Sequence, residues 1–174
     1  MTEPAARRLD VICLGRAAVD LYGQQLGGRF EEVQTFAKYL GGSSANVAVG
    51  LARLGSRASM LSRVGDEQMG RFVREALAGA GVDVSHLATD PQRLTALVLL
   101  GICGHDEYPH IFYREQCADM GLDAGDFDAG YIASSRLLAI TGTHLSTTGT
   151  AAAVMKAVGL ARAHGTRVVF DIDY

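Results

Sequence analysis

The sequence is organised around the stretch Leu40-Gly41-Gly42-Ser43-Ser44-Ala45-Asn46-Val47-Ala48-Val49-Gly50-Leu51-Ala52-Arg53-Leu54-Gly55. Two glycines, two serines and an asparagine lead into a run of small apolar residues, which predicts a buried helix. Ser43 or Ser44 is expected to cap the first turn, because a serine hydroxyl can accept from a free backbone N–H group. Gly55 is expected to end the helix in a left-handed conformation.

The start of this helix is a candidate ligand site. Gly41 and Gly42 carry no Cβ atom, so a ligand can approach the main chain there. Free N–H groups and the partial positive charge of a helix start attract polyols and anions. The amide of Asn46 needs a partner in a buried helix, and a substrate hydroxyl and the neighbouring backbone are both candidates. The local pattern fits equally well a capped helix that binds nothing.

The composition is that of a globular protein with one core. The chain has 174 residues, of which 48% are hydrophobic and 20% charged, and its formal net charge is −3. The absence of a basic run argues against a nucleic acid partner. No apolar run is long enough to span a membrane, and residues 1–8 lack the apolar core of a secretory signal, so a cytoplasmic location is expected. The three cysteines form no zinc or redox motif, and Cys13 is expected to be buried.

Short apolar runs alternate with helical patterns along the chain. Strands are predicted over 9–15, 57–64, 136–142 and 167–174, and helices over 43–54, 67–79 and 147–164. This order predicts a mostly parallel sheet with crossover helices. Asp66 is the expected N-cap of the second helix. Asp20 lies just past the first strand, where ligands bind in open α/β sheets, although a turn carboxylate is an equally good interpretation.

The pattern changes in two segments. Residues 95–102 and 109–114 predict an antiparallel hairpin that serves as a lid or an edge extension. Residues 23–39 are irregular and predict a short strand or flap. Arg114 offers a guanidinium fork suited to a carboxylate or phosphate, and a solvated arginine at a strand end is the slightly favoured alternative.

Three other polar residues receive structural interpretations. His144 is expected to be a loop histidine with local hydrogen bonds rather than a residue of the site. Asp171 and Asp173 alternate with apolar residues and would share one face of the last strand. We expect both carboxylates to pair with an arginine that follows Tyr174, in preference to organising Mg²⁺ through water.

Over residues 9–174 the chain resembles the amino-terminal half of the ribokinase-like (PfkB) carbohydrate kinases. The motifs that carry this resemblance are the strand ending at Gly15 with Asp20, the glycine-serine-asparagine motif at 41–46, and Val-Gly-Asp at 64–66 with Gly70. Residues 112–120, 141–144 and 170–174 are most similar to a branch of the family that acts on a keto-deoxy sugar acid.

The resemblance implies a fold and a set of site residues. The fold is α/β, a three-layer ribokinase-like arrangement with a mostly parallel sheet and a small β lid built from segments of about 20–40 and 94–114. Residues 1–174 would be the amino-terminal part of one domain, truncated before the ATP-binding half. The implied substrate-binding residues are Asp20, Gly41, Gly42 and Asn46 for the sugar hydroxyls, and Phe112 and Arg114 for the acid end.

The resemblance also implies the activity and the partners. The activity is ATP-dependent phosphorylation of a sugar acid with Mg²⁺, in a protein that could form a homo-oligomer through the lid. Ser43 stands where ribokinase-type members often carry Lys, and Ala18 where some carry Asn, so ribose is a less expected substrate.

One motif of the family is missing from the chain. No Gly-Ala-Gly-Asp segment, which holds the family's general base and anion hole, occurs among the 174 residues. We therefore expect no catalytic residue and no kinase turnover in this chain alone. The alternatives are another sugar kinase of the same family, such as a 2-keto-3-deoxygluconate kinase, and a non-catalytic sugar-binding module.

Overall fold

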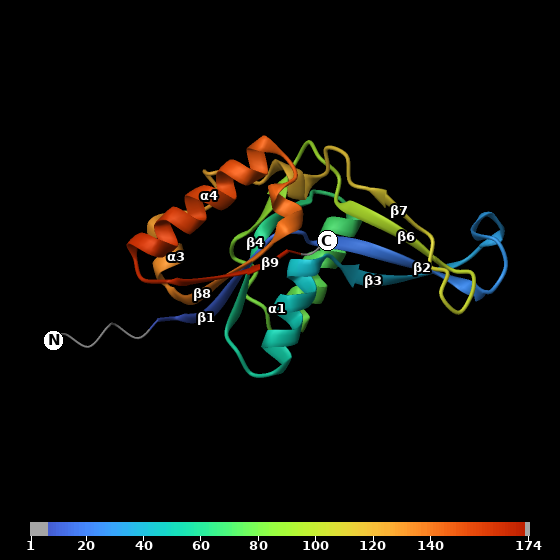
Figure 1. Ribbon diagram of the computed structural model, residues 1–174, viewed down its shortest axis with the longest axis horizontal. Coiled ribbons are helices and arrows are strands. Elements are labelled where there is room, and N and C mark those ends of the chain that lie inside the picture. The colour runs from blue at the N-terminus through green and yellow to red at the C-terminus, as the bar shows by residue number, and fades with distance from the viewer. Residues whose placement is uncertain (1–6, 173–174) are drawn as a thin grey trace.

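The computed structural model describes residues 7–172, which form two β-sheets and the helices that cover them (Figure 1). The larger sheet has the order β5-β4-β1-β8-β9, and every neighbouring pair in it is parallel. Its strands are β1 (Leu9–Leu14), β4 (Ala58–Gly65), β5 (Leu87–Asp90), β8 (Ser135–Thr141) and β9 (Arg167–Asp171). The predicted parallel sheet is confirmed, although β5 was not predicted because its four residues show no clear period.

Helices cover both faces of the larger sheet and make a three-layer structure (Figure 1). The helices are α1 (Ser43–Arg53) and α2 (Gln68–Gly79) on one face, and α3 (Ala129–Ala133) and α4 (Thr148–Ala163) on the other. Alternate residues of β1 serve the two cores: Val11 and Cys13 pack with α1 and α2, whereas Ile12 and Leu14 pack with α3 and α4. Cys13 is fully buried, as predicted.

A second sheet, called the small sheet below, extends from one end of the larger sheet (Figure 1). Its order is β3-β2-β6-β7, with β2 (Ala18–Leu26), β3 (Phe36–Gly41), β6 (Ala96–Ile102) and β7 (His110–Tyr113). The predicted hairpin of β6 and β7 is confirmed as antiparallel. β2 runs parallel to β6 at the centre of the small sheet, so both segments expected in the lid form one sheet.

The segment at 23–39 is more regular than its sequence indicates. β2 continues to Leu26, and β3 pairs with it in antiparallel register. The side-chain oxygen of Gln25 accepts from the backbone N–H groups of Gln34 and Thr35, which fastens the two strands across their connection. The predicted short strand is confirmed by β3, whereas the extension of β2 to Leu26 was not predicted, because β2 depends on pairing with β6, far along the chain.

The helix α1 begins without a serine cap. Its N-cap is Gly42, with no side-chain hydrogen bond. The Ser44 hydroxyl instead donates to the carbonyl oxygen of Leu14 at 3.0 Å, so it ties the helix to the end of β1. The predicted serine cap is therefore wrong. The predicted helix end is confirmed, because Gly55 follows α1 with a φ of 88°.

Only one face of α1 is buried. Ser44, Ala45 and Ala48 are buried against the larger sheet, whereas Asn46 and Val47 are exposed. The prediction of a wholly buried helix was thus wrong, because α1 packs as one outer layer and no described residue covers its outer face.

The helix α2 begins at Glu67 rather than Asp66. The carboxylate of Glu67 accepts from the N–H groups of Met69 and Gly70 at 2.6 and 3.2 Å. Its other oxygen accepts from the backbone N–H of Thr95 at 2.9 Å, next to the start of β6. Asp66 is exposed, so the predicted cap is wrong. Glu67 is the better cap because its carboxylate accepts both from N–H groups of the first turn of α2 and from the N–H of Thr95 before β6.

This contact predicts unequal effects of two neighbouring substitutions. Glu67→Ala should lower the free energy of unfolding by about 1–2 kcal/mol, because it leaves the first turn of α2 and the Thr95 N–H without an acceptor. The matched control, Asp66→Ala, should stay within about 0.5 kcal/mol of the parent protein. Urea unfolding of both variants measures the difference, and equal losses would show that Glu67 is not the cap.

Candidate functional site

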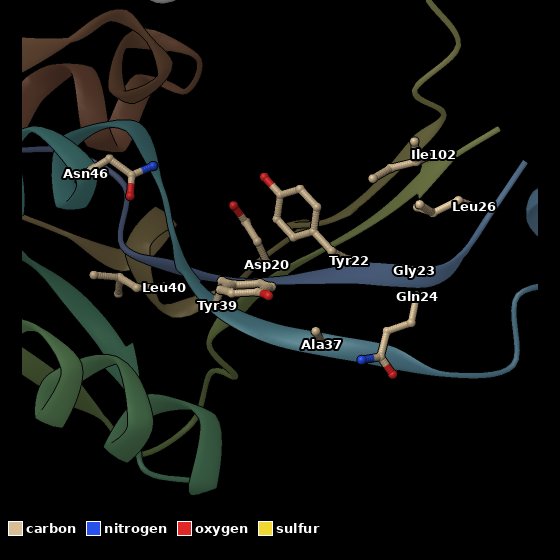
Figure 2. Close-up of a pocket in the computed structure, with 10 residues that line it drawn as sticks. All are labelled: Asp20, Tyr22, Gly23, Gln24, Leu26, Ala37, Tyr39, Leu40, Asn46 and Ile102. Carbon is tan, nitrogen blue, oxygen red and sulfur yellow. The ribbon is translucent and has the colours of Figure 1, made fainter. Parts of the chain in front are cut away.

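A pocket of about 600 Å³ lies between the small sheet and the start of α1 (Figure 2). Asp20 and Tyr22 point into it from β2, Tyr39 flanks it on β3, and Asn46 lies at its α1 end. The structure therefore brings together Asp20 and Asn46, two of the residues that the sequence predicted for the site.

The strand register sets the order of side chains on this face of the small sheet. Asp20 is paired with Tyr39 on one side and with Val98 on the other, and Val98 is paired with Phe112. Paired residues in neighbouring strands point to the same face, so these four side chains form a row across the small sheet. Asp20 is thus next to Tyr39, whereas the predicted Phe112 lies two strands away, beyond Val98, and lines another cavity.

The carboxylate of Asp20 is half-buried and open to a ligand. Burial raises its pKa, and the nearby Arg16 opposes that rise. Within residues 7–172, no donor forms a hydrogen bond to this carboxylate. A partly desolvated carboxylate without a donor favours ligand groups that can donate, such as sugar hydroxyls. Asn46 is exposed rather than buried, so its amide is also accessible from the pocket.

Because Gly41 and Gly42 have no side chains, other parts of the chain can approach them closely. A Cβ atom on Gly41 would lie 2.0 Å from Oδ1 of Asp20. Gly42 has a φ of 96°, and a Cβ on it would lie 2.4 Å from the carbonyl oxygen of Arg16. The predicted need for glycine is supported, but what approaches these glycines in the structure is Asp20 and the Arg16 backbone.

Three residues near the pocket were not singled out from the sequence. The rings of Tyr22 and Tyr39 meet edge to face, with centroids 5.4 Å apart. The Arg16 guanidinium lies 5.5 Å from the centre of the Phe112 ring. Tyr22 could have been found from its position two residues after Asp20, and Arg16 from its place directly after Gly15. Tyr39 depends on the register of β2 and β3, which the sequence does not show.

Arg114 lies in a separate cavity of about 460 Å³, next to Phe112 and Tyr113. Its Nε–H donates to Oδ2 of Asp119 at 2.8 Å, and Nη2 lies 2.8 Å from the same oxygen. Only 16% of the Arg114 side chain and none of the Asp119 side chain is exposed. Burial raises the pKa of Asp119, and Arg114 opposes that rise. The alternative of a solvated arginine is therefore wrong, and the predicted fork is partly occupied by Asp119.

His144 is fully buried in the short helix η3 (Gly142–Leu145) that follows β8. Its Nε2 lies 3.2 Å from the backbone oxygen of Asp119. Burial, with smaller contributions from Arg114 and Arg16, lowers its pKa to about 3, so the ring is neutral. The expectation of a loop histidine with local hydrogen bonds is wrong, because its partner is 25 residues away in the sequence.

Two other expectations concern ions and membranes. Within residues 7–172, no three His, Cys, Asp or Glu side chains gather in a way that could hold a metal ion. Asp173 lies outside the described residues, so the expected pairing of Asp171 and Asp173 with an arginine after Tyr174 stays a prediction. None of the helices in the described part of the chain is long and apolar enough to cross a membrane.

The comparisons with known proteins identify the family. A model described as "pfkB family carbohydrate kinase" matches residues 8–174, so the chain belongs to this family. Its similarity to a 5-dehydro-2-deoxygluconokinase of Shouchella clausii is 41% identity over 97% of this chain and 52% of the relative. A second relative of the same name, from Geobacillus kaustophilus, is 42% identical over 95% of this chain and 50% of the relative. The chain thus spans about half the length of the curated relatives it matches.

Solved structures share the same fold. The crystal structure of a PfkB protein from Polaromonas sp. JS666 aligns with a TM-score of 0.88 and 35% identity, covering 94% of this chain and 55% of that one. Fructokinase from Xylella fastidiosa with bound ATP aligns with a TM-score of 0.86 and 26% identity, covering 95% and 52%. The ribokinase-like fold and the family resemblance predicted from the sequence are confirmed.

If the pocket binds a carbohydrate, the contact between Gly41 and Asp20 predicts that substitution of Gly41 weakens this binding. Gly41→Ala should displace the Asp20 carboxylate and weaken binding about tenfold or more, because bonds to a charged group would be lost. In the matched control, Gly50→Ala, the added methyl meets no atom within 4 Å, so affinity should be unchanged. Calorimetric titration with a panel of neutral sugars and sugar acids tests this. Equal affinities for the two variants would contradict the role of Asp20.

Proposed function

We propose that the protein containing this chain phosphorylates a keto-deoxy sugar acid, 5-dehydro-2-deoxygluconate, with ATP and Mg²⁺. The observation that carries this proposal is the Asp20 carboxylate, which is half-buried, has no donor among the described residues and faces a pocket flanked by aromatic rings. Support for the substrate comes from the names of the relatives at 41% and 42% identity. A role in inositol catabolism follows from the same proposal.

Each predicted site residue receives a role in this proposal. Asp20 accepts from sugar hydroxyls, and Asn46 can donate to or accept from another hydroxyl. Gly41 and Gly42 keep the main chain close to Asp20. Phe112 offers an aromatic face to the carbon side of the sugar.

Arg114 binds the carboxylate of the substrate in this proposal. Its Nε–H and Nη2 both face Oδ2 of Asp119, and Nη2 is buried, whereas Nη1 forms no hydrogen bond with residues 7–172. A donor on the guanidinium therefore remains for an acid group, and charge-assisted bonds from arginine to a carboxylate are among the strong polar contacts of proteins.

We assign no residue of this chain to ATP or Mg²⁺. The described residues hold no group of metal-binding side chains, and they do not fit a resident metal ion. When bound, ATP supplies the phosphoryl group, and the residues described here only bind and orient the sugar. The general base, the lid-mediated oligomer and the cytoplasmic location remain predictions.

Two alternative functions would use the same pocket. Another sugar kinase of the family, such as one for 2-keto-3-deoxygluconate, would use Asp20 and Asn46 in the same way and differ in the contacts to the acid end. A non-catalytic sugar-binding module would bind the ligand without turnover. A Gly-Ala-Gly-Asp segment in the natural reading frame would favour the kinase, and a sugar-binding protein without ADP release would favour the module.

Substitution of Arg114 tests the proposed substrate class. In the natural gene product that contains this chain, Arg114→Ala should lower kcat/KM for 5-dehydro-2-deoxygluconate about tenfold to a hundredfold, because a charge-assisted bond is lost. Activity on the neutral keto sugar D-fructose should change by less than about threefold. The control is Arg136→Ala, whose side chain is 68% exposed and pairs only weakly with Asp10.

Coupled measurement of ADP release gives the readout. The 174-residue chain alone should release no ADP that depends on both ATP and sugar. Turnover by the chain alone would contradict its assignment as the sugar-binding part, and an unchanged preference in Arg114→Ala would remove the acid-binding role.

A further inference from the structure

Asp119 is a charged residue with no exposed surface beside the proposed acid-binding position. It lies in the short helix η2 (Ala118–Gly121), directly after the segment that leaves β7. A buried carboxylate is costly unless it is paired, so its partner defines what it does. That partner is Arg114, whose Nε–H donates to Oδ2 at 2.8 Å.

The backbone of Asp119 is anchored to the rest of the fold. The N–H group of Ala118 donates to the carbonyl oxygen of Leu94 at 2.8 Å, close to the start of β6. On the other side, Nε2 of the neutral His144 donates to the carbonyl oxygen of Asp119, since a carbonyl can only accept. Asp119 is thus held between the base of the small sheet and the end of β8.

Arg114 has a local backbone contact, because its carbonyl oxygen accepts from the N–H of Cys117 at 3.2 Å, but this contact does not fix its side chain. Arg114 follows the last residue of β7, and a long arginine side chain has several rotamers available there. The contact with Asp119 uses one edge of the guanidinium, formed by Nε and Nη2, and fixes the plane of the group. A fork fixed in advance loses less conformational entropy when it binds a carboxylate.

We infer that Asp119 is a positioning residue, which holds the Arg114 guanidinium in the orientation that presents its remaining donors to the acid end of the substrate. It thereby contributes to the preference for a sugar acid over a neutral sugar. This inference rests on the proposed function, because it requires Arg114 to bind the acid group.

Replacement of Asp119 removes a charge and also releases the Arg114 guanidinium, and these two changes have opposite effects on acid binding. Asp119 carries a negative charge close to Arg114, so its loss would strengthen acid binding if charge alone mattered. If orientation matters more, the loss weakens acid binding even though a negative charge has gone. The anchored backbone and the full burial of Asp119 favour orientation.

The test compares two affinities in one preparation of the natural gene product. Dissociation constants for 5-dehydro-2-deoxygluconate and for D-fructose are measured by calorimetry, and their ratio gives the acid preference, which does not depend on the folded fraction. Asp119→Ala should lower this preference about tenfold. Asp119→Asn keeps an acceptor of the same size for Arg114 and should lower it by no more than about threefold.

A double-mutant cycle shows whether Asp119 acts through Arg114. In an Arg114→Ala background, adding Asp119→Ala should change the acid preference by less than about twofold. The matched control is Asp123→Ala, which removes a carboxylate of the same loop that pairs with Arg63 instead. This control should leave the preference unchanged.

Two contrary outcomes are distinguishable. If Arg114→Ala lowers the preference but both Asp119 variants leave it unchanged or raise it, the positioning role is overturned and the proposed function stands. If Arg114→Ala itself leaves the preference unchanged, the acid-binding part of the proposed function fails, and the inference about Asp119 fails with it.

Discussion

The close approach of two of the segments that connect the sheets determines the rest of the structure. The chain leaves β1 for the small sheet at Gly15–Ala18 and returns from it at Gly41–Ser43, and the two crossings lie in contact. The N–H of Ala45 donates to the carbonyl oxygen of Arg16 at 3.2 Å, so the start of α1 is bonded to the exit from β1. Because no side chain fits between the crossings, the polar residues on either side of them, Asp20 and Asn46, face one pocket.

Much of the larger sheet could be predicted from local sequence, because β1 and β4 are buried along most of their length, as strands covered on both faces are. The small sheet could be predicted only in part. The hairpin of β6 and β7 is local and was found, whereas β2 carries polar, exposed residues and its strand conformation depends on pairing with β6. The cap of α2 could not be found from spacing, because Thr95 makes Glu67 the better choice.

Some residues of the candidate site could likewise be predicted from local sequence, and others could not. Asp20, Gly41, Gly42 and Asn46 belong to short motifs at the ends of predicted elements, so their positions could be inferred from the chain alone. The burial of Arg114 and His144 could not, because both contact Asp119, which the sequence shows only as an acidic residue in a turn. The alignment of Tyr39 with Asp20 and Phe112 requires the strand register, which propensities do not determine.

The parallel pairing of β2 with β6 has a consequence for folding kinetics. It joins Ala18 to Ala96, so the chain between them must be organised before the ladder can form. The cost of closing so long a loop falls once α1, β4, α2 and β5 have packed against β1. The small sheet is therefore expected to complete late in folding, and to open first in the native state. The candidate pocket would then lie in the part of the protein that opens first, where binding energy has the greatest effect on amide hydrogen exchange.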